Sequence, residues 1–223
     1  MRILIVAATA AEIDPCVARL KETGYDMASP YQARFHLDVL VTGVGMVATA
    51  ARCAQALALQ KYDLALNLGV CGTFDPLLLP GTTVHVVSDC FAELGAEDDG
   101  RFLTIQELRL LGDDEFPFRG GRLVNDAPPL NPALGALPAV DGITVNTVHG
   151  DERTIDAVVR RFHPQVESME GAAFMYACLV QGVPFAQVRA VSNVVERRNR
   201  AAWKMTDAIH NLSATAVEIL DHV

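Results

Sequence analysis

The sequence has only five cysteines, and no two of them are spaced as a CxxC motif. The five thiols are odd in number and include no CxxC pair, so they indicate neither a disulfide framework nor a zinc site: Cys16, Cys53, Cys71, Cys90 and Cys178. Cys71 stands in a Gly-rich turn without a visible base partner, and we interpret it as small and buried. The histidines show no metal-ligand spacing. We therefore expect no metal and a reducing, cytoplasmic location.

Positive charge and long apolar runs are also scarce. Lys and Arg number 18 against 27 Asp and Glu, giving a net charge of −9, which argues against nucleic-acid or membrane-surface binding. No run approaches the ~18–20 apolar residues of a membrane span. The opening "MRILIVAATAA" carries only Arg2 as a basic residue and is followed by Glu12 and Asp14, so it favours a first strand over a secretion signal. A small-molecule ligand is expected.

Short apolar runs alternate with helical patterns along the chain. The expected strands are Arg2–Ala8, Leu37–Thr42, Leu64–Leu68, Thr82–Ser88, Ile143–Thr147 and Phe185–Val191. The expected helices are Ala10–Thr23, Met46–Gln60, Glu152–Phe162, Met169–Gln181 and Ala201–Leu220. Apolar strands alternating with helices indicate an α/β fold whose sheet is covered on both faces. The length of 223 residues fits one domain, 1–223.

Residues 92–140 differ in composition from the rest. They concentrate acidic residues, Gly and Pro in "GAEDDG", "GDDEFPFRGG" and "NDAPPLNPALGALPAV". We expect an irregular surface excursion with a short helix around Ile105–Leu111. Such excursions often cap a ligand.

Glu12 follows the first strand at the start of a helix. It completes a capping box with Thr9, in which the carboxylate satisfies only the helix start. A second interpretation is functional, because ligands of α/β sheets bind at the carboxyl ends of strands, where Glu12 lies. The local sequence leaves both open.

Two Gly-rich turns follow strands. In "VTGVGMVATAA", Gly43 and Gly45 precede a helix and allow close approach of the backbone to a ligand, although Ala48 breaks the dinucleotide pattern GxGxxG. The turn "NLGVCGTFD" after Leu64–Leu68 is a signal of the same kind.

Two further strand or helix ends bring polar groups. Glu170 in "VESMEGAAFMYACLVQG" begins a helix whose small residues permit close packing, and a carboxylate there is either favoured by the helix dipole alone or placed to bind a sugar diol. The strand Phe185–Val191 ends at Ser192-Asn193, where an Asn is usually turn chemistry. Together Glu12, Glu170 and Asn193 offer two acids and an amide, which suit proton transfer and hydrogen bonding.

The order of these motifs resembles the nucleoside phosphorylase and nucleosidase superfamily over nearly the whole chain. The motifs are the strand before Glu12, "TGVGMVATA", "NLGVCGTFD", "VESMEGAA" and "VPFAQVRAVSN". The resemblance implies a three-layer α/β/α domain around a twisted mixed sheet, a nucleoside substrate, no organic cofactor and a homo-oligomer. The stretches "HGDERTIDAVVRRF" and "VSNVVERRNRAAW" further resemble the branch that releases hypoxanthine.

Carried over by position, the resemblance implies a role for each site residue. Glu12 activates the attacking water and Arg189 helps to place it. Met169 and Glu170 hold the ribose. Asn193 faces the purine at N7 and its 6-substituent, with Ser192 in support. Val70 and Gly72 of the Gly-rich turn contact the substrate.

Asn193 favours a 6-oxo base over adenine. Relatives that release adenine have an Asp here, whereas Asn can donate to O6 while its carbonyl accepts the N7 proton. Phosphorylases of the superfamily carry a Gly-Asp-Pro-x-Arg loop after the first strand, and this chain has "AATAAEID" instead, so water is the expected nucleophile. The alternatives are a general purine nucleosidase or phosphorylase, a methylthioadenosine/S-adenosylhomocysteine nucleosidase, and an inactive nucleoside-binding protein.

Two departures from the family pattern concern the substrate's surroundings. Val70 stands where adenine-releasing relatives have a Ser that helps to hold the water. Residues 92–140 carry no family motif, and Arg101, Arg109 and Arg119 are candidates for binding a substrate carboxylate or are surface charges. The loop 197–200 is either a lid or a solvated basic turn.

Overall fold

The computed structural model describes residues 1–22 and 35–223. Its larger sheet has eight strands in the order β10-β4-β8-β9-β3-β1-β2, with β7 beside β4 and a further pairing of β10 with β3. The main strands are β1 (Arg2–Ala7), β2 (His36–Val41), β3 (Leu64–Thr73), β4 (Thr83–Asp89), β8 (Ala139–Thr144), β9 (Val166–Ser168) and β10 (Phe185–Val194), and β7 is the short Leu123–Val124.

The sheet is mixed, as expected. β1 runs parallel to β2 and β3, and β10 runs parallel to β3. β4 is antiparallel to β10, and β9 is antiparallel to β3. Because β1, β3 and β10 are parallel, their carboxyl ends meet at one edge of the sheet, where the ligand crevice of such folds lies.

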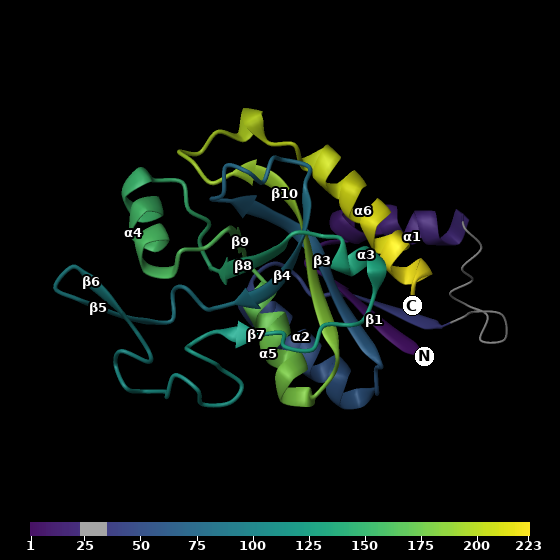
Figure 1. The fold of residues 1–223 in the computed structure, drawn as a ribbon, viewed down its shortest axis with the longest axis horizontal. Helices are drawn as coiled ribbons and strands as arrows, with labels where there is room; N and C mark the ends of the chain where they lie inside the picture. The colour runs from purple at the N-terminus through teal and green to yellow at the C-terminus, as the bar shows by residue number, and fades with distance from the viewer. Residues whose placement is uncertain (23–34) are drawn as a thin grey trace.

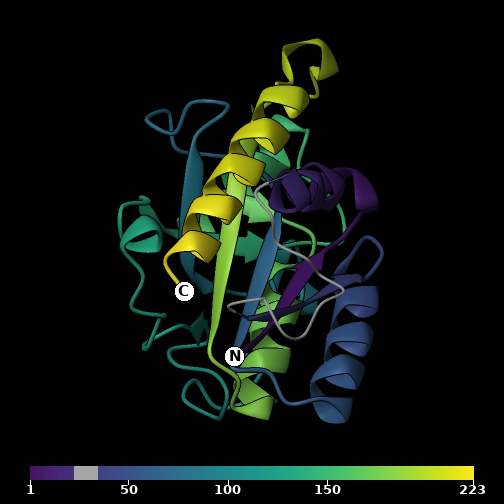
Figure 2. The ribbon, with the colours of Figure 1, turned by 90° about the vertical axis from the view of Figure 1, so that its right-hand side faces the viewer.

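Helices cover both faces of the sheet (Figure 1). One core cluster joins the sheet to α1 (Ala10–Glu22), α3 (Pro132–Gly135) and α6 (Met205–Asp221). A second joins it to α2 (Met46–Leu59) and α5 (Gly171–Gln181). Figure 2 shows α6, in yellow, lying along β10 with α1 beside it. The expected three-layer α/β/α architecture is therefore confirmed. No described helix has the length and apolarity that crossing a bilayer requires.

Two predicted strands are too short. β3 continues through the supposed turn "GVCGT" to Thr73, because β10 and β9 both pair with it there. β10 does not stop at Ser192-Asn193 but continues to Val194, with a register shift between Val191 and Asn193. Such a bulge inserts a residue and redirects a side chain. The polar pair therefore lies within a strand rather than in a turn.

Other predicted boundaries shift. β8 occupies Ala139–Thr144 rather than Ile143–Thr147, because Ala139, Val140 and Asp141 pair with β4. α6 begins at Met205, after a 3₁₀ turn at Arg200–Ala202. α4 (Glu152–Phe162) has the predicted bounds. The predicted end of the first helix, Thr23, lies outside the described residues.

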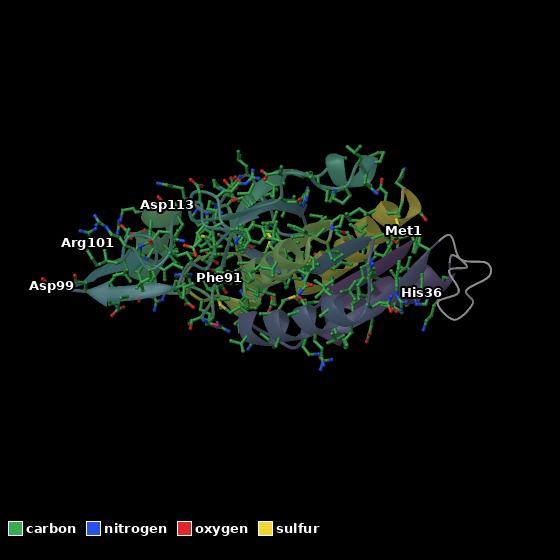
Figure 3. All side chains as sticks on the ribbon, turned by 90° about the horizontal axis from the view of Figure 1, so that it is seen from below. Met1, His36, Phe91, Asp99, Arg101 and Asp113 are labelled. Atoms are coloured by element: carbon green, nitrogen blue, oxygen red, sulfur yellow. The ribbon has the colours of Figure 1, made fainter. Side chains whose placement is uncertain are left out.

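The excursion at 92–140 contains a β-hairpin that was not expected and lacks the helix that was expected. A hairpin of β5 (Gly95–Asp98) and β6 (Arg101–Thr104) projects from the body, with Asp99 and Arg101 at its tip (Figure 3). The predicted helix at Ile105–Leu111 is wrong, and turns replace it. Arg109 has a φ of 56°, a left-handed conformation that interrupts a right-handed helix.

Candidate active site

A cavity of about 430 Å³ lies at the carboxyl ends of β3 and β10, beside the starts of α1 and α6. Seven of the eight predicted site residues line it: Glu12, Val70, Gly72, Met169, Glu170, Ser192 and Asn193. The eighth, Arg189, is 1% exposed. The fold therefore brings together the residues that the motif order singled out.

Glu12 is buried and held by three donors. Its Oε2 accepts hydrogen bonds from the backbone N–H and the hydroxyl of Thr9, at 2.9 and 2.8 Å. Its Oε1 accepts from the backbone N–H of Val70 at 3.2 Å. The contacts to Thr9 are those of a helix cap, but the contact to Val70 joins the carboxylate to β3 and the cavity. One side chain thus both caps the helix and lines the cavity.

Glu170 directly precedes α5 and is buried at the cavity wall. Its Oε1 accepts a hydrogen bond from the N–H of Gly45 at 2.9 Å, and its Oε2 lies 3.7 Å from Nη1 of Arg189. The Gly43-x-Gly45 turn therefore positions the carboxylate. Gly45 has a φ of 95°, a conformation that favours glycine.

Arg189 lies under the cavity in a polar network. Its Nε donates to Oε1 of Gln187 at 3.1 Å, and its Nη2 donates to Oδ1 of Asn67. Gln187 in turn donates from Nε2 to Oδ2 of Asp89 at 3.1 Å. Burial raises the pKa of Asp89 to about 6, although hydrogen bonds from Gln187 and Thr144 lower it. A buried charge needs such partners, and they fix the guanidinium in one orientation.

Two glycines leave room for this network. A Cβ on Gly69 would lie 2.2 Å from Nη1 of Arg189 and 3.2 Å from Oε1 of Glu12. A Cβ on Gly171 would lie 2.3 Å from Oδ2 of Asp89. The distances of 2.2 and 2.3 Å are shorter than any normal van der Waals contact of a Cβ atom, so a side chain at either position would displace these groups. The close packing predicted for the start of the α5 helix is thus confirmed.

Asn193 lies at the cavity wall on the bulge of β10. The hydroxyl of Ser192 lies 2.8 Å from its Oδ1, and its Nδ2 donates to the carbonyl of Val194 at 2.9 Å. These contacts fix which end of the amide is the donor. One N–H and a further lone pair of Oδ1 stay available to a ligand. Ser192 is therefore placed to support Asn193, as its position in the motif implied.

Sequence reasoning missed a third buried carboxylate at the cavity, Glu167. It is 3% exposed, lines the cavity, and accepts hydrogen bonds from the backbone N–H of His149 at 3.0 Å and from its Nδ1 at 2.7 Å. Glu167 stands in the same "VESMEGAA" motif as Glu170. The sequence signal that could have found it is a second carboxylate in the same motif, on the short strand β9. Nothing in the sequence pointed to His149 as its partner.

Arg101, Arg109 and Arg119 do not line the cavity. Arg101 pairs with Glu107 and Arg119 with Asp126, both on the surface. Instead Arg198, from the loop 197–200, lines the cavity together with Trp203, and its guanidinium carbon lies 5.6 Å from the centre of that ring. At least this residue of the loop therefore belongs to the site.

The thiol of Cys71 is buried at the cavity, and burial raises its pKa to about 12. It is therefore a poor nucleophile near neutral pH, as expected. In the described ranges, 1–22 and 35–223, no cluster of His, Cys, Asp or Glu is suited to hold a metal ion. The arrangement offers three buried acids, a buried guanidinium and an oriented amide, which suit cleavage of a bond to a hydrogen-bonding leaving group.

Comparisons with known proteins agree with the motif order. A family model described as "Phosphorylase superfamily" matches residues 2–223. Futalosine hydrolase of Streptomyces coelicolor is 31% identical, with 96% of this chain and 92% of that protein covered. Futalosine hydrolase of Acidothermus cellulolyticus is 33% identical, with 94% and 86% covered.

Solved structures share the fold. The 5′-methylthioadenosine/S-adenosylhomocysteine nucleosidase of Helicobacter pylori, with butyl-thio-DADMe-Immucillin-A, has a TM-score of 0.80 at 15% identity, covering 100% of this chain and 99% of that chain. Futalosine hydrolase of the same organism has a TM-score of 0.79 at 14% identity, covering 100% and 98%. At these identities the likeness shows the fold alone, which both enzymes use.

Proposed function

This chain belongs to the phosphorylase superfamily, and we propose that it hydrolyses the N-glycosidic bond of futalosine, releasing hypoxanthine and dehypoxanthine futalosine on a route to menaquinone. The relatives at 31% and 33% identity are futalosine hydrolases over most of their length. The observation that carries the choice of base is Asn193, whose amide is oriented by Ser192 at the cavity wall.

In this proposal Asn193 reads the 6-oxo group. Its free N–H donates to O6, and Oδ1 accepts from the protonated N7 of the departing base. Adenine offers an amino group at position 6, which would face that N–H donor to donor. A buried polar group left unpaired in this way can reject the wrong base by ~10⁴–10⁵. Hypoxanthine is therefore preferred.

Water is the nucleophile, and Glu12 takes its proton. Glu12 faces the cavity with Oε1 and is anchored by Thr9 and Val70. Val70 supplies a backbone N–H where relatives use a Ser, so a water at Oε1 lies beside β3. Nη1 of Arg189 lies 3.7 Å from Oε2 of Glu170. A Cβ on Gly69 would lie 2.2 Å from that Nη1 and 3.2 Å from Oε1 of Glu12, so Arg189 also lies near Glu12. In this proposal it orients Glu170 and helps to place the water.

Met169 and Glu170 hold the ribose. Glu170 accepts hydrogen bonds from the ribose hydroxyls, and these strengthen as the sugar gains positive charge in the transition state. The thioether of Met169 packs on the apolar face of the ring, and Gly72 leaves space beside Asn193, since a Cβ there would lie 3.3 Å from Nδ2. No cofactor takes part in this scheme.

Residues 1–223 act as one catalytic domain that assembles into homo-oligomers. Exposed apolar side chains support an interface on the α2 and α5 side: Val44, Val47, Tyr176 and Val180 are 58, 79, 39 and 47% exposed. Val44 also lines the cavity, so a partner there would approach the substrate. Light scattering after gel filtration measures the mass. The five buried free thiols suit the cytoplasm.

A substrate panel tests the function. The purified protein is incubated with futalosine, its 6-amino analogue, methylthioadenosine and inosine, and released bases are separated by chromatography. We expect hypoxanthine from futalosine, with little or no base from the others. If adenine is released from methylthioadenosine faster than hypoxanthine is released from futalosine, the chain is a methylthioadenosine/S-adenosylhomocysteine nucleosidase instead.

A further inference from the structure

Asn193 poses a chemical problem that the residues assigned so far leave unsolved. As the C1′–N9 bond breaks, its electron pair moves into the purine, and N7 takes up a proton. An Asp can supply that proton, but an amide N–H does not ionise in this pH range. Glu12 accepts a proton from water, and therefore does not supply one to the base. The site needs a separate proton source at its Asn193 end.

A small side cavity of about 50 Å³ lies at that end. It shares six lining residues with the main cavity: Gly72, Val148, Glu167, Asn193, Arg198 and Trp203. His149 lines the side cavity as well. The volume exceeds the ≳10–15 Å³ that one water needs, and the walls are polar enough to bind it. A water there can bridge His149 and the base.

The imidazole of His149 is oriented by a buried carboxylate, as in histidines that transfer protons. Nδ1 lies 2.7 Å from Oε2 of Glu167, and the backbone N–H of His149 donates to Oε1 at 3.0 Å. Because Nδ1 is engaged by the buried carboxylate, Nε2 is the nitrogen that exchanges a proton with the cavity. A carboxylate in this position orients the ring and stabilises the imidazolium. The ring of Phe74 packs edge-on at 6.4 Å.

We propose that His149, oriented by Glu167, delivers through a water in the side cavity the proton that N7 of the departing base takes up. This inference rests on the proposed release of a 6-oxo base. The Nε2 proton passes to the water, and a proton of that water passes to N7 while the C1′–N9 pair enters the purine. A second water attacks C1′ and gives its proton to Glu12. Glu12 then releases its proton to solvent and solvent returns a proton to His149, so atoms and charge balance.

Charged groups around His149 come from several elements. Glu167 lies on β9, and Glu196 and Arg198, from the segment between β10 and α6, line the side cavity. On its outer side His149 lines another cavity, between the β5–β6 hairpin and α4, whose charged residues are Glu93, Glu97, Arg101 and Arg161. Glu167 is the carboxylate that contacts the ring. Histidine is the side chain whose usual titration lies near neutrality, which suits reprotonation between turnovers.

His149→Asn tests the relay. The Asn amide can still donate to Glu167 from the place of Nδ1, but it lacks Nε2. We expect kcat for hypoxanthine release from futalosine to fall by about 10²-fold or more, the usual effect of a positioned proton donor, with KM little changed. Added imidazole should restore part of the rate. We expect the kcat of the wild type to fall at alkaline pH, and this fall should be missing in the variant.

His163→Asn is the matched control. His163 is exposed and ends α4 in a left-handed conformation that Asn tolerates, so its kinetics should equal those of the wild type. Thermal melting checks that His149→Asn is folded, and His149→Gln serves if it is not. A folded variant with wild-type kcat and the wild-type pH profile would show that the Glu167–His149 contact only braces the loop. Wild-type protein that releases no hypoxanthine contradicts the proposed function instead.

Discussion

Buried Arg189 lies behind Glu170, which lines the cavity, with Nη1 3.7 Å from Oε2 of Glu170. The other carboxylate oxygen of Glu170 accepts from Gly45. The plane of the carboxylate is therefore set from two sides before any ribose arrives. This relation depends on the rest of the guanidinium, because Gln187 and Asn67 hold its other nitrogens.

Arg189→Lys tests that dependence. Lysine keeps the charge but offers no planar fork, so the contacts to Gln187 and Asn67 are not both kept. We expect kcat/KM for futalosine to fall by about 10²-fold, the cost of a small misplacement of catalytic groups. Steady-state kinetics measures this. An unchanged kcat/KM in a folded Arg189→Lys variant would remove Arg189 from the catalytic arrangement.

Glu12→Gln separates chemistry from binding. Gln keeps the size of the side chain but takes no proton from water, so kcat should fall by at least about 10²-fold. Substrate affinity, measured by calorimetry on the slowed variant, should be largely kept. Asp14→Asn, an exposed change on the same helix, is the control. A Glu12→Gln protein with normal turnover rules out Glu12 as the base.

Gly69→Ala tests whether the close approach of two strands builds the site. The new Cβ would lie 2.2 Å from Nη1 of Arg189, so the guanidinium has to move. Activity should be lost, with a lower melting temperature as a buried network is strained. Gly135→Ala adds the same methyl group where nothing lies within 4 Å, and it should behave as the wild type. If the two variants are equally active, Gly69 is not needed to make room for Arg189.

Asn193→Asp should change the base that is released. A carboxyl group accepts from a 6-amino group and can donate to N7, so kcat/KM for the 6-amino analogue of futalosine should rise. For futalosine itself it should fall, because the donor to O6 is lost. Competition between the two substrates in one tube gives the ratio directly. A ratio that does not move assigns base choice to other residues.

Asp89 predicts a pH dependence of stability. Burial raises its pKa to about 6 from 3.8, so the folded state binds this proton more tightly than the unfolded state does. The corresponding contribution, about 3 kcal/mol, is present below pH 4 and is lost as the pH rises through 6. We expect urea unfolding between pH 4 and 7 to show that the free energy of unfolding of Asp89→Asn increases relative to that of the wild type as the pH rises. A constant difference between the two proteins argues against a raised pKa.

His85 should act in the opposite direction. Burial lowers its pKa to about 4 from 6.5, and its buried Nε2 has no hydrogen-bond partner. The unfolded state therefore binds the proton more tightly, and stability is lost as the pH falls below 6.5. His85→Leu should remove this loss and leave the protein at pH 7 as stable as the wild type or more so. The same urea series measures it, and a variant that is just as acid-sensitive contradicts the assignment.

The sequence predicted which residues line the cavity better than it predicted the bounds of the strands that carry them. Glu12 and Asn193 follow apolar runs that form parallel strands, whereas Glu170 precedes a helix start rich in small residues and follows β9, which is antiparallel to β3. The bulge that keeps Asn193 within β10 had no local signal, because it arises from pairing with β3. The His149–Glu167 contact joins residues 18 apart through the sheet. Single-sequence patterns report periodicity and end signals, whereas these features depend on tertiary pairing.

We propose that a water bound at Glu12 displaces a 6-oxo purine from futalosine. The first experiment follows hypoxanthine release by the wild-type protein in buffer without phosphate and again with added phosphate. We expect release at the same rate in both buffers, with no sugar phosphate formed. Release that requires phosphate, or release of adenine in preference to hypoxanthine, would contradict it.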